Sequence, residues 1–184
     1  MSDHKLVLHP IKPTAILQDP PELLERLAQL RLIGPSFNHE GEVHHKPGPR
    51  FRELVVFKGG AAPSPAGDDS PYHVALTPMT GEPIFLGGAN ARAPLCPGCR
   101  ARIEGWRQKL QEWQMAPSEP WTCTKCGRRR RAHELEWDHR GGFARYALDI
   151  WNIHEDEAEP SAELLELLRV VTYEDWTYFY YRFP

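Results

Sequence analysis

Hydrophobic and polar positions near the start of the chain predict a strand, a helix and a second strand. Residues 5–9 alternate weakly between apolar and polar side chains, as in a half-buried strand. Asp19 precedes two prolines and a glutamate, which is a typical start of a helix. Gly34-Pro35 predicts the end of that helix, and the apolar run at residues 51–57 predicts the second strand. The stripe of the helix consists of Leu23, Leu24, Leu27 and Leu30.

The same succession returns near the end of the chain. Residues 143–153 predict a long strand, residues 160–171 predict a helix, and residues 176–183 predict an aromatic strand. Two β-α-β units of this size predict an α+β fold with a ferredoxin-like, split β-α-β core. The alternative is that the two helices only share the ordinary likeness of leucine-rich amphipathic segments.

The middle of the chain contains more loops. Residues 35–50 predict a polar loop, and the proline-rich residues 59–71 predict an exposed, flexible one. Two short strands are expected at residues 73–77 and 83–86. The nine histidines of the chain are scattered, so we expect them to lie in exposed loops without a shared metal ion.

All four cysteines lie in two CxxC pairs, Cys96/Cys99 and Cys123/Cys126, separated by 23 residues. Two such turns supply the four thiolates of a tetrahedral zinc site. A closed four-thiolate site leaves no position for a reacting water, so we expect structural Zn²⁺ rather than catalysis. The alternatives are a redox-active dithiol, for which one CxxC pair would suffice, and plain buried cysteines.

The segment around these cysteines resembles a zinc ribbon or zinc knuckle, over residues 94–131 only. A helix is predicted between the two pairs, with an apolar face formed by Ile103, Trp106, Leu110 and Trp113. The predicted organisation is a first half of the core at residues 1–93, a zinc ribbon-like insertion at 94–131 and a second half at 132–184.

Charge is distributed unevenly over these parts, although the net charge is only −3. Residues 94–131 contain nine Lys or Arg and three Asp or Glu, whereas residues 132–184 contain four and twelve. The run Arg128, Arg129, Arg130 and Arg131 suits a polyanionic partner, because guanidinium groups bind carboxylates and phosphates through paired hydrogen bonds. Alternatively, the arginines are solvated or paired with the acidic C-terminal part.

Trp106 and Trp113 are further candidates for contact with a partner, either by stacking on bases or at a protein interface. The alternative is that they pack inside the zinc-binding segment. We expect a binding or adaptor protein with a protein partner. A nucleic-acid-binding protein that uses the basic segment is the second interpretation.

The segment WDHRGG resembles the Asp-His motif of HNH nucleases, which often contain CxxC zinc pairs. The resemblance implies that His139 is a general base and Asp138 a metal ligand. In that family the CxxC pairs usually flank the Asp-His motif, whereas here both pairs precede it. An HNH-like nuclease is therefore the third interpretation, and a simple turn at Asp138-His139 is its alternative.

Composition and the N-terminus bear on the compartment. No segment approaches 18 consecutive apolar residues, and residues 1–13 lack the apolar stretch of a secretory signal. Unoxidised CxxC pairs suit a reducing compartment. We therefore expect a cytoplasmic protein without a membrane span.

Overall fold

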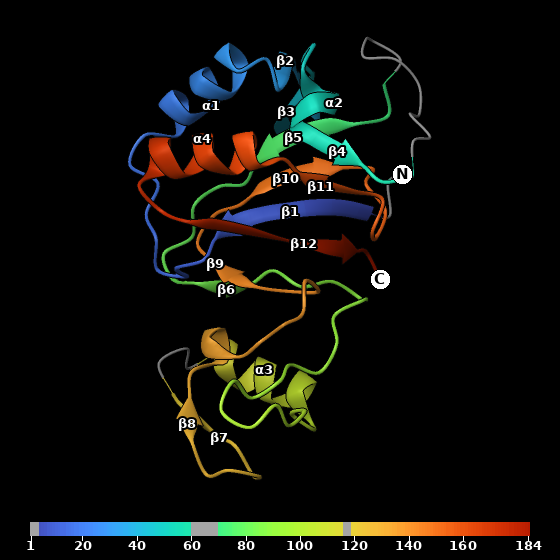
Figure 1. Ribbon diagram of the computed structural model, residues 1–184. Helices are drawn as coiled ribbons and strands as arrows, with labels where there is room; N and C mark the ends of the chain where they lie inside the picture. Colours follow the sequence, from blue (N-terminus) through green and yellow to red (C-terminus); the bar gives the residue numbers. More distant parts are fainter. Residues whose placement is uncertain (1–3, 60–69, 116–118) are drawn as a thin grey trace.

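The computed structural model describes residues 4–59, 70–115 and 119–184. Six antiparallel strands form the main sheet, in the order β12-β1-β10-β5-β3-β2. Helices α1 and α4 cover one face of this sheet, and the cysteine-bearing segment lies on the other side, below β6 and β9 (Figure 1). The strands of the sheet are β1 (His4–Pro10), β2 (Ile33–His39), β3 (Glu42–Pro47), β5 (His73–Leu76), β10 (Leu148–Trp151) and β12 (Trp176–Arg182).

Helix α1 (Pro20–Gln29) begins as the sequence predicts. The Asp19 side chain accepts a hydrogen bond from the backbone N–H of Glu22 at 2.9 Å, and Leu23 and Leu27 are buried against the sheet. The helix ends earlier than predicted, because Arg31 adopts a left-handed conformation with φ of 67°. Gly34-Pro35 lies in β2 instead.

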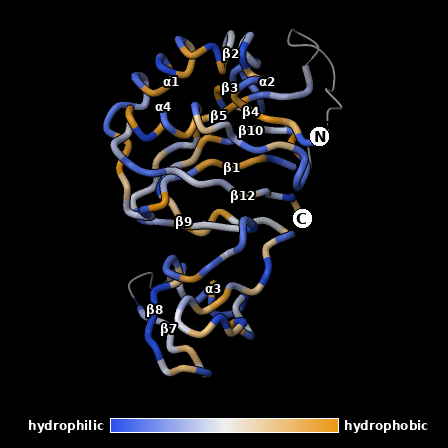
Figure 2. The backbone as a smooth tube through the Cα atoms, in the orientation of Figure 1, coloured by the Kyte–Doolittle hydropathy of each residue, from blue (hydrophilic) through white to orange (hydrophobic). Residues whose placement is uncertain are grey.

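Helix α4 (Ala162–Thr172) is capped in the same way, by the hydroxyl of Ser161, which accepts from the backbone N–H of Leu164. Leu164 and Leu168 are fully buried. They join the main core between helices and sheet. Figure 2 shows β1 as a hydrophobic stretch in the middle of this sheet. The principal strand residues of this core are Leu6, Leu8, Val74, Leu148, Ile150 and Tyr180, and Tyr146 joins them from the connection between β9 and β10.

The prediction of a strand at residues 51–57 is wrong. Phe51–Leu54 forms a helical turn, α2, because Phe51 and Leu54 are three positions apart and both enter the core. Only Val55–Phe57 is extended, as β4, and it pairs with β11 (Ala158–Pro160) outside the main sheet.

The prediction of a polar loop at residues 35–50 is also wrong, since β2 and β3 form a hairpin there. Its turn is Glu40-Gly41, both with positive φ, which suits the twist of a tight hairpin. The expected long strand at residues 143–153 is divided into β9 (Phe143–Ala144) and β10, and β9 pairs with β6 (Ile84–Phe85). Most of the loop predicted at residues 59–71 lies outside the described residues.

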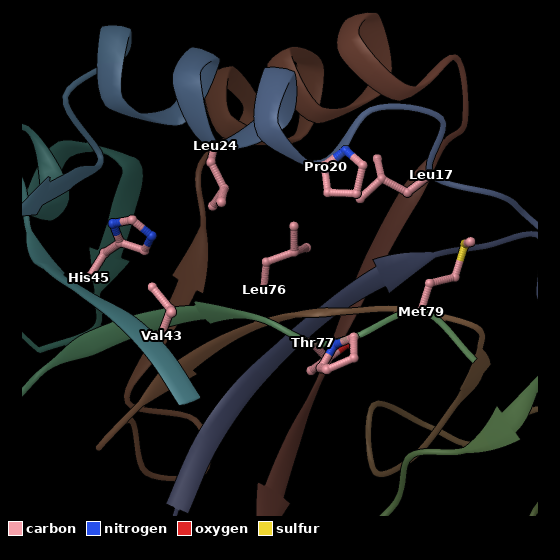
Figure 3. A pocket seen from close by; sticks show the side chains of 9 residues that line it. Leu17, Pro20, Leu24, Val43, His45, Leu76, Thr77 and Met79 are labelled. Atoms are coloured by element: carbon pink, nitrogen blue, oxygen red, sulfur yellow. The ribbon is translucent and has the colours of Figure 1, made fainter. Parts of the chain in front are cut away.

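A cavity of about 240 Å³ lies between α1 and the sheet (Figure 3). Leu17, Pro20 and Leu24 border it from the helix side, and Val43 and Leu76 border it from the strands. Its lining is mainly aliphatic, which indicates imperfect packing beneath α1 rather than a catalytic or polar ligand-binding site.

Candidate metal centre

The four cysteine sulfurs converge at the far end of the segment that lies below the sheet. All four Sγ atoms lie within 4.8 Å of one another. The Sγ atoms of Cys96 and Cys126 are 3.8 Å apart, and those of Cys99 and Cys123 are 3.7 Å apart. A tetrahedral zinc ion with Zn–S bonds of 2.3 Å separates its sulfurs by about 3.8 Å. The cluster therefore suits a structural metal such as Zn²⁺, whereas a disulfide needs sulfurs about 2 Å apart.

Backbone turns hold the two CxxC pairs in matching conformations. The N–H of Arg100 donates to the carbonyl of Cys96 at 2.8 Å, and the N–H of Gly127 donates to the carbonyl of Cys123 at 2.8 Å. Each residue directly follows the second cysteine of its pair, and both have positive φ, 60° and 70°. Gly127 serves this conformation easily, whereas Arg100 adopts it at a steric cost.

The environment of Cys123 favours the thiolate that a metal needs. Backbone N–H groups of Cys126 and Lys125 lower the pKa of the Cys123 thiol against the opposing effect of burial. The pKa of the Cys99 thiol moves the other way: against the lowering effect of the Ala101 backbone, burial and hydrogen bonds with the other three thiols raise it. Cys96 and Cys123 are buried while Cys99 and Cys126 are exposed. The site is therefore anchored on its inner side and open to solvent on its outer side.

A second apolar core surrounds the inner cysteines and shares no buried residue with the main core. Helix α3 (Trp106–Met115) and the hairpin of β7 (Trp121–Thr122) and β8 (Arg129–Arg130) enclose it. Leu135, Trp137 and Phe143 also belong to this core, so it extends beyond residues 94–131. We call the part of the chain from Ala91 to Phe143 the cysteine module.

The four arginines behind the second CxxC pair lie at the surface of this module. Arg128, Arg129 and Arg131 are exposed and Arg130 is half-buried, and β8 stands out as a hydrophilic segment in Figure 2. Among the described residues, none of the four guanidinium groups forms an ion pair. The Arg128 side chain instead packs over Gly98, where a Cβ atom would lie 2.8 Å from its Cδ.

The acidic C-terminal part does not neutralise these arginines. Its carboxylates pair with other basic side chains, as Glu163 does with Arg50 at 2.8 Å and Glu159 with Lys58 at 3.1 Å. Glu155 is likewise bound by Arg140. The described residues therefore contain no ion pair between the arginine run and the acidic part.

The tryptophans predicted to contact a partner lie inside the module. Trp106 is 8% exposed and Trp113 is 6% exposed, and both rings pack in the core of the module. Their amphipathic spacing reflects this burial. The structure gives the prediction of a partner contact through Trp106 and Trp113 no support.

Asp138 and His139 form a tight turn, with φ of 49° and 51°. Nδ1 of His139 lies 2.7 Å from the carbonyl oxygen of Tyr178, and the imidazole stacks on the Tyr178 ring at 4.8 Å. Both residues border a cavity of about 330 Å³, which His9 and His133 also line. This placement agrees with a simple turn, and the nuclease interpretation stays a prediction.

The histidines differ from the prediction of scattered, exposed loop positions. His44 is 1% exposed and His73 is 8% exposed, and strands β2, β3 and β5 bring both next to His39. Burial lowers the pKa of His73 to about 4, and the neighbouring imidazoles of His44 and His39 add to the effect. The sequence contained one signal for this arrangement: Glu40-Gly41 is a typical two-residue hairpin turn, and it lies between His39 and His44. A hairpin there brings these two histidines close together.

Comparisons with protein families, with curated proteins and with solved structures find no match for this chain. No helix among the described residues is long and apolar enough to cross a membrane.

Proposed function

We propose that the protein is a binding or adaptor module for a protein partner, in which structural zinc maintains the shape of an arginine-bearing surface. One observation carries this proposal. The four thiols have the spacing of a tetrahedral metal site, and the turn of the second pair leads directly into four arginines without an ion-pair partner among the described residues. Unpaired arginines at a surface favour carboxylate-bearing partners, because the guanidinium group binds carboxylates in a bidentate manner.

The fold proposals are consistent with this function. We propose that the cysteine module is zinc ribbon-like and that the core has ferredoxin-like connectivity. The order β12-β1-β10-β5, with α1 and α4 on one face, supports a split β-α-β arrangement. In this arrangement the module is inserted between β5 and β10, away from the helices, so that its surface is accessible to a partner.

A nucleic-acid partner is the second candidate, and the same unpaired arginines favour it. Trp106 and Trp113 are buried and do not offer stacking platforms in this arrangement. A nucleic-acid complex would therefore depend on phosphate contacts and would weaken steeply with salt. This dependence separates the two candidates experimentally.

The test is affinity capture from an extract of the native host, with and without nuclease treatment. The wild-type protein is compared with a variant in which Arg128, Arg129, Arg130 and Arg131 are replaced by Ser. The control variant carries Arg26→Ser and Arg169→Ser, two exposed arginines on α1 and α4. We expect a protein that the wild type and the control retain, that the four-arginine variant loses, and that nuclease does not release.

Two outcomes contradict the proposal. If the four-arginine variant captures the same proteins as the wild type, the arginine surface is not the binding surface. If nuclease releases everything that the arginines retain, the nucleic-acid candidate replaces the protein partner.

A further inference from the structure

A cavity of about 750 Å³ lies where the main sheet meets the cysteine module. On one side it is bordered by β6, by the residues just before β6, and by Phe143 of β9. On the other side it is bordered by Trp113 and Gln114 of α3 and by residues 131–133, which follow β8. Figure 1 shows β6 and β9 above α3, with this junction between them. Its volume is typical of ligand-binding cavities, which often lie between two packed units. It is called the junction cavity below.

The wall of the junction cavity is largely apolar. The rings of Phe85 and Phe143 have their centres 5.3 Å apart and pack in the core of the module, to which Trp113 also belongs. Ile84 borders the same cavity and is 43% exposed, so part of this aliphatic side chain faces solvent. An exposed apolar side chain at the mouth of an apolar cavity is typical of a place where a partner inserts an aliphatic or aromatic side chain.

A positive charge without a counter-ion stands beside this wall. Arg131 borders the cavity and is exposed, and its guanidinium group forms no ion pair among the described residues. It is the last residue of the arginine run, so positive charge gathers on the module side of the cavity. Glu82 borders the cavity on the side of β6, and these two described residues form no ion pair with each other. Burial lowers the pKa of His133, so this third titratable group is mainly neutral at neutral pH.

We propose that the junction cavity binds an acidic peptide segment of the protein partner, which inserts one apolar side chain beside Ile84 and Phe85 and places a carboxylate against Arg131. This inference rests on the proposed function and names the chemistry of the partner. A guanidinium group binds a carboxylate through paired hydrogen bonds, and an anchor side chain in a cavity dominates the binding energy of many interfaces. The arginine run alone would bind any polyanion, whereas the apolar cavity next to it selects a segment that has both kinds of side chain.

A nucleic acid fits this combination less well. Its phosphates pair with arginines, but a base in the cavity needs an open aromatic ring face for stacking. Trp113 is 6% exposed and Phe143 is 9% exposed, so neither ring offers such a face. Aliphatic Ile84 is the most exposed apolar side chain of the cavity, and it suits an apolar side chain of a peptide better than a base.

The experiment is the selection of peptides from a random library displayed on phage, on the immobilised full chain with bound Zn²⁺. We expect the enriched peptides to share an aromatic or branched aliphatic residue next to Asp or Glu. The most enriched peptide is then synthesised with a fluorescent label, and its dissociation constant is measured by fluorescence anisotropy. Enrichment of peptides without acidic residues, or no enrichment at all, would contradict the inference.

Ile84→Ser is the test variant, because Ile84 is partly exposed and belongs to none of the apolar clusters. It should weaken binding of the labelled peptide at least about tenfold, and Arg131→Ser should weaken it about three- to tenfold. Val170→Ser is the matched control, since Val170 is 54% exposed on α4, on the other side of the sheet (Figure 1). A peptide whose apolar residue is replaced by Ser should bind the wild type at least about tenfold more weakly, and this result does not depend on the stability of any variant.

The outcomes separate this inference from the proposed function. If the four-arginine variant loses the peptide while Ile84→Ser binds it like the wild type, the cavity inference fails and the arginine surface remains the binding surface. If Ile84→Ser weakens binding and the four-arginine variant does not, the acidic part of the inference fails. If no peptide is enriched while a labelled oligothymidylate binds and Ile84→Ser weakens its binding, a nucleic acid occupies the cavity instead.

Discussion

His9 and Gly142 are packed so closely that a Cβ atom on Gly142 would lie 2.4 Å from Nε2 of His9. His9 is at the end of β1, 4% exposed, and Gly142 directly precedes β9, which leads from the cysteine module back to the sheet. The two residues therefore lie in close contact where the cysteine module joins the main sheet.

Gly142→Ala should destabilise the protein by about 1–3 kcal/mol, because the added methyl group overlaps a buried ring that has little room to move. The measurement is the free energy of unfolding from denaturant titration. Gly81→Ala is the control, since a Cβ atom there meets nothing within 4 Å. Equal effects of the two substitutions would show that the His9 contact is not tight in solution.

Stability should decrease as pH falls from about 6.5 to about 4, because the pKa values of two buried histidines, His9 and His73, are lowered to about 4. His9 is the one that the variant below replaces. Burial lowers the pKa of His9 to about 4, against a smaller opposite effect of its hydrogen bond to the carbonyl of Pro10. The unfolded state therefore binds a proton that the folded state excludes in this range, and protonation favours unfolding. The loss over the whole range is about 2–3 kcal/mol from this group.

The check is the free energy of unfolding as a function of pH for the wild type and His9→Gln. In the variant, the free energy of unfolding should depend less steeply on pH, because up to one proton fewer is bound on unfolding. The slope should decrease by at most about 1.4 kcal/mol per pH unit. His154→Gln serves as the control with an exposed histidine. An unchanged slope in His9→Gln would assign the acid sensitivity to other groups.

Cys123→Ser should remove the metal and open the cysteine module before the rest of the chain. Cys123 belongs to the apolar core of the module together with Cys96, and structural zinc contributes strongly to the folding of such small units. Hydrogen exchange should show loss of protection at residues 94–131, while β1 and β10 stay protected. Lys125→Ser, an exposed change within the same turn, should keep both the metal and the protection.

Leu27→Ala should have the reverse effect. Leu27 is fully buried in the main core, and its truncation should cost about 2–5 kcal/mol. Because the two cores share no buried residue, the module should still bind its metal at the denaturant concentration at which half of the molecules have lost the main sheet. Leu24→Ala, at a partly buried position of the same helix, is the control and should lower the free energy of unfolding by less than Leu27→Ala does. Loss of metal and sheet in one transition would instead show that the two cores fold as one unit.

Local rules of sequence predicted the parts of this fold that depend on neighbouring residues. Asp19 caps α1, and the two CxxC pairs meet. Trp106, Leu110 and Trp113 form the apolar face of α3 as expected, whereas Ile103 enters the same core from the turn before the helix. Each of these features is encoded over a few positions or by a distinctive ligand set.

Features that depend on distant contacts were predicted poorly. The apolar run at residues 51–57 satisfies a strand pattern, but its helical turn is selected by the place of Phe51 and Leu54 in the core. The cluster of His39, His44 and His73 combines residues from three strands that pair only in the folded sheet, so the spacing of these histidines along the chain does not predict it. The tryptophans illustrate the same limit, since spacing alone cannot separate a core stripe from a binding surface.

The pairing of β1 also determines the order in which the chain can fold. This strand begins at His4, yet its two neighbours, β10 and β12, come from residues 148–151 and 176–182. Contacts between such distant positions form slowly, because a long loop must be closed before they contribute. Strand β1 therefore stays unpaired until β10 and then β12 have been made, and the cysteine module, which ends at Phe143, is made just before β10. Until β10 and β12 are available, the apolar residues of β1 have no sheet partner and are prone to aggregation.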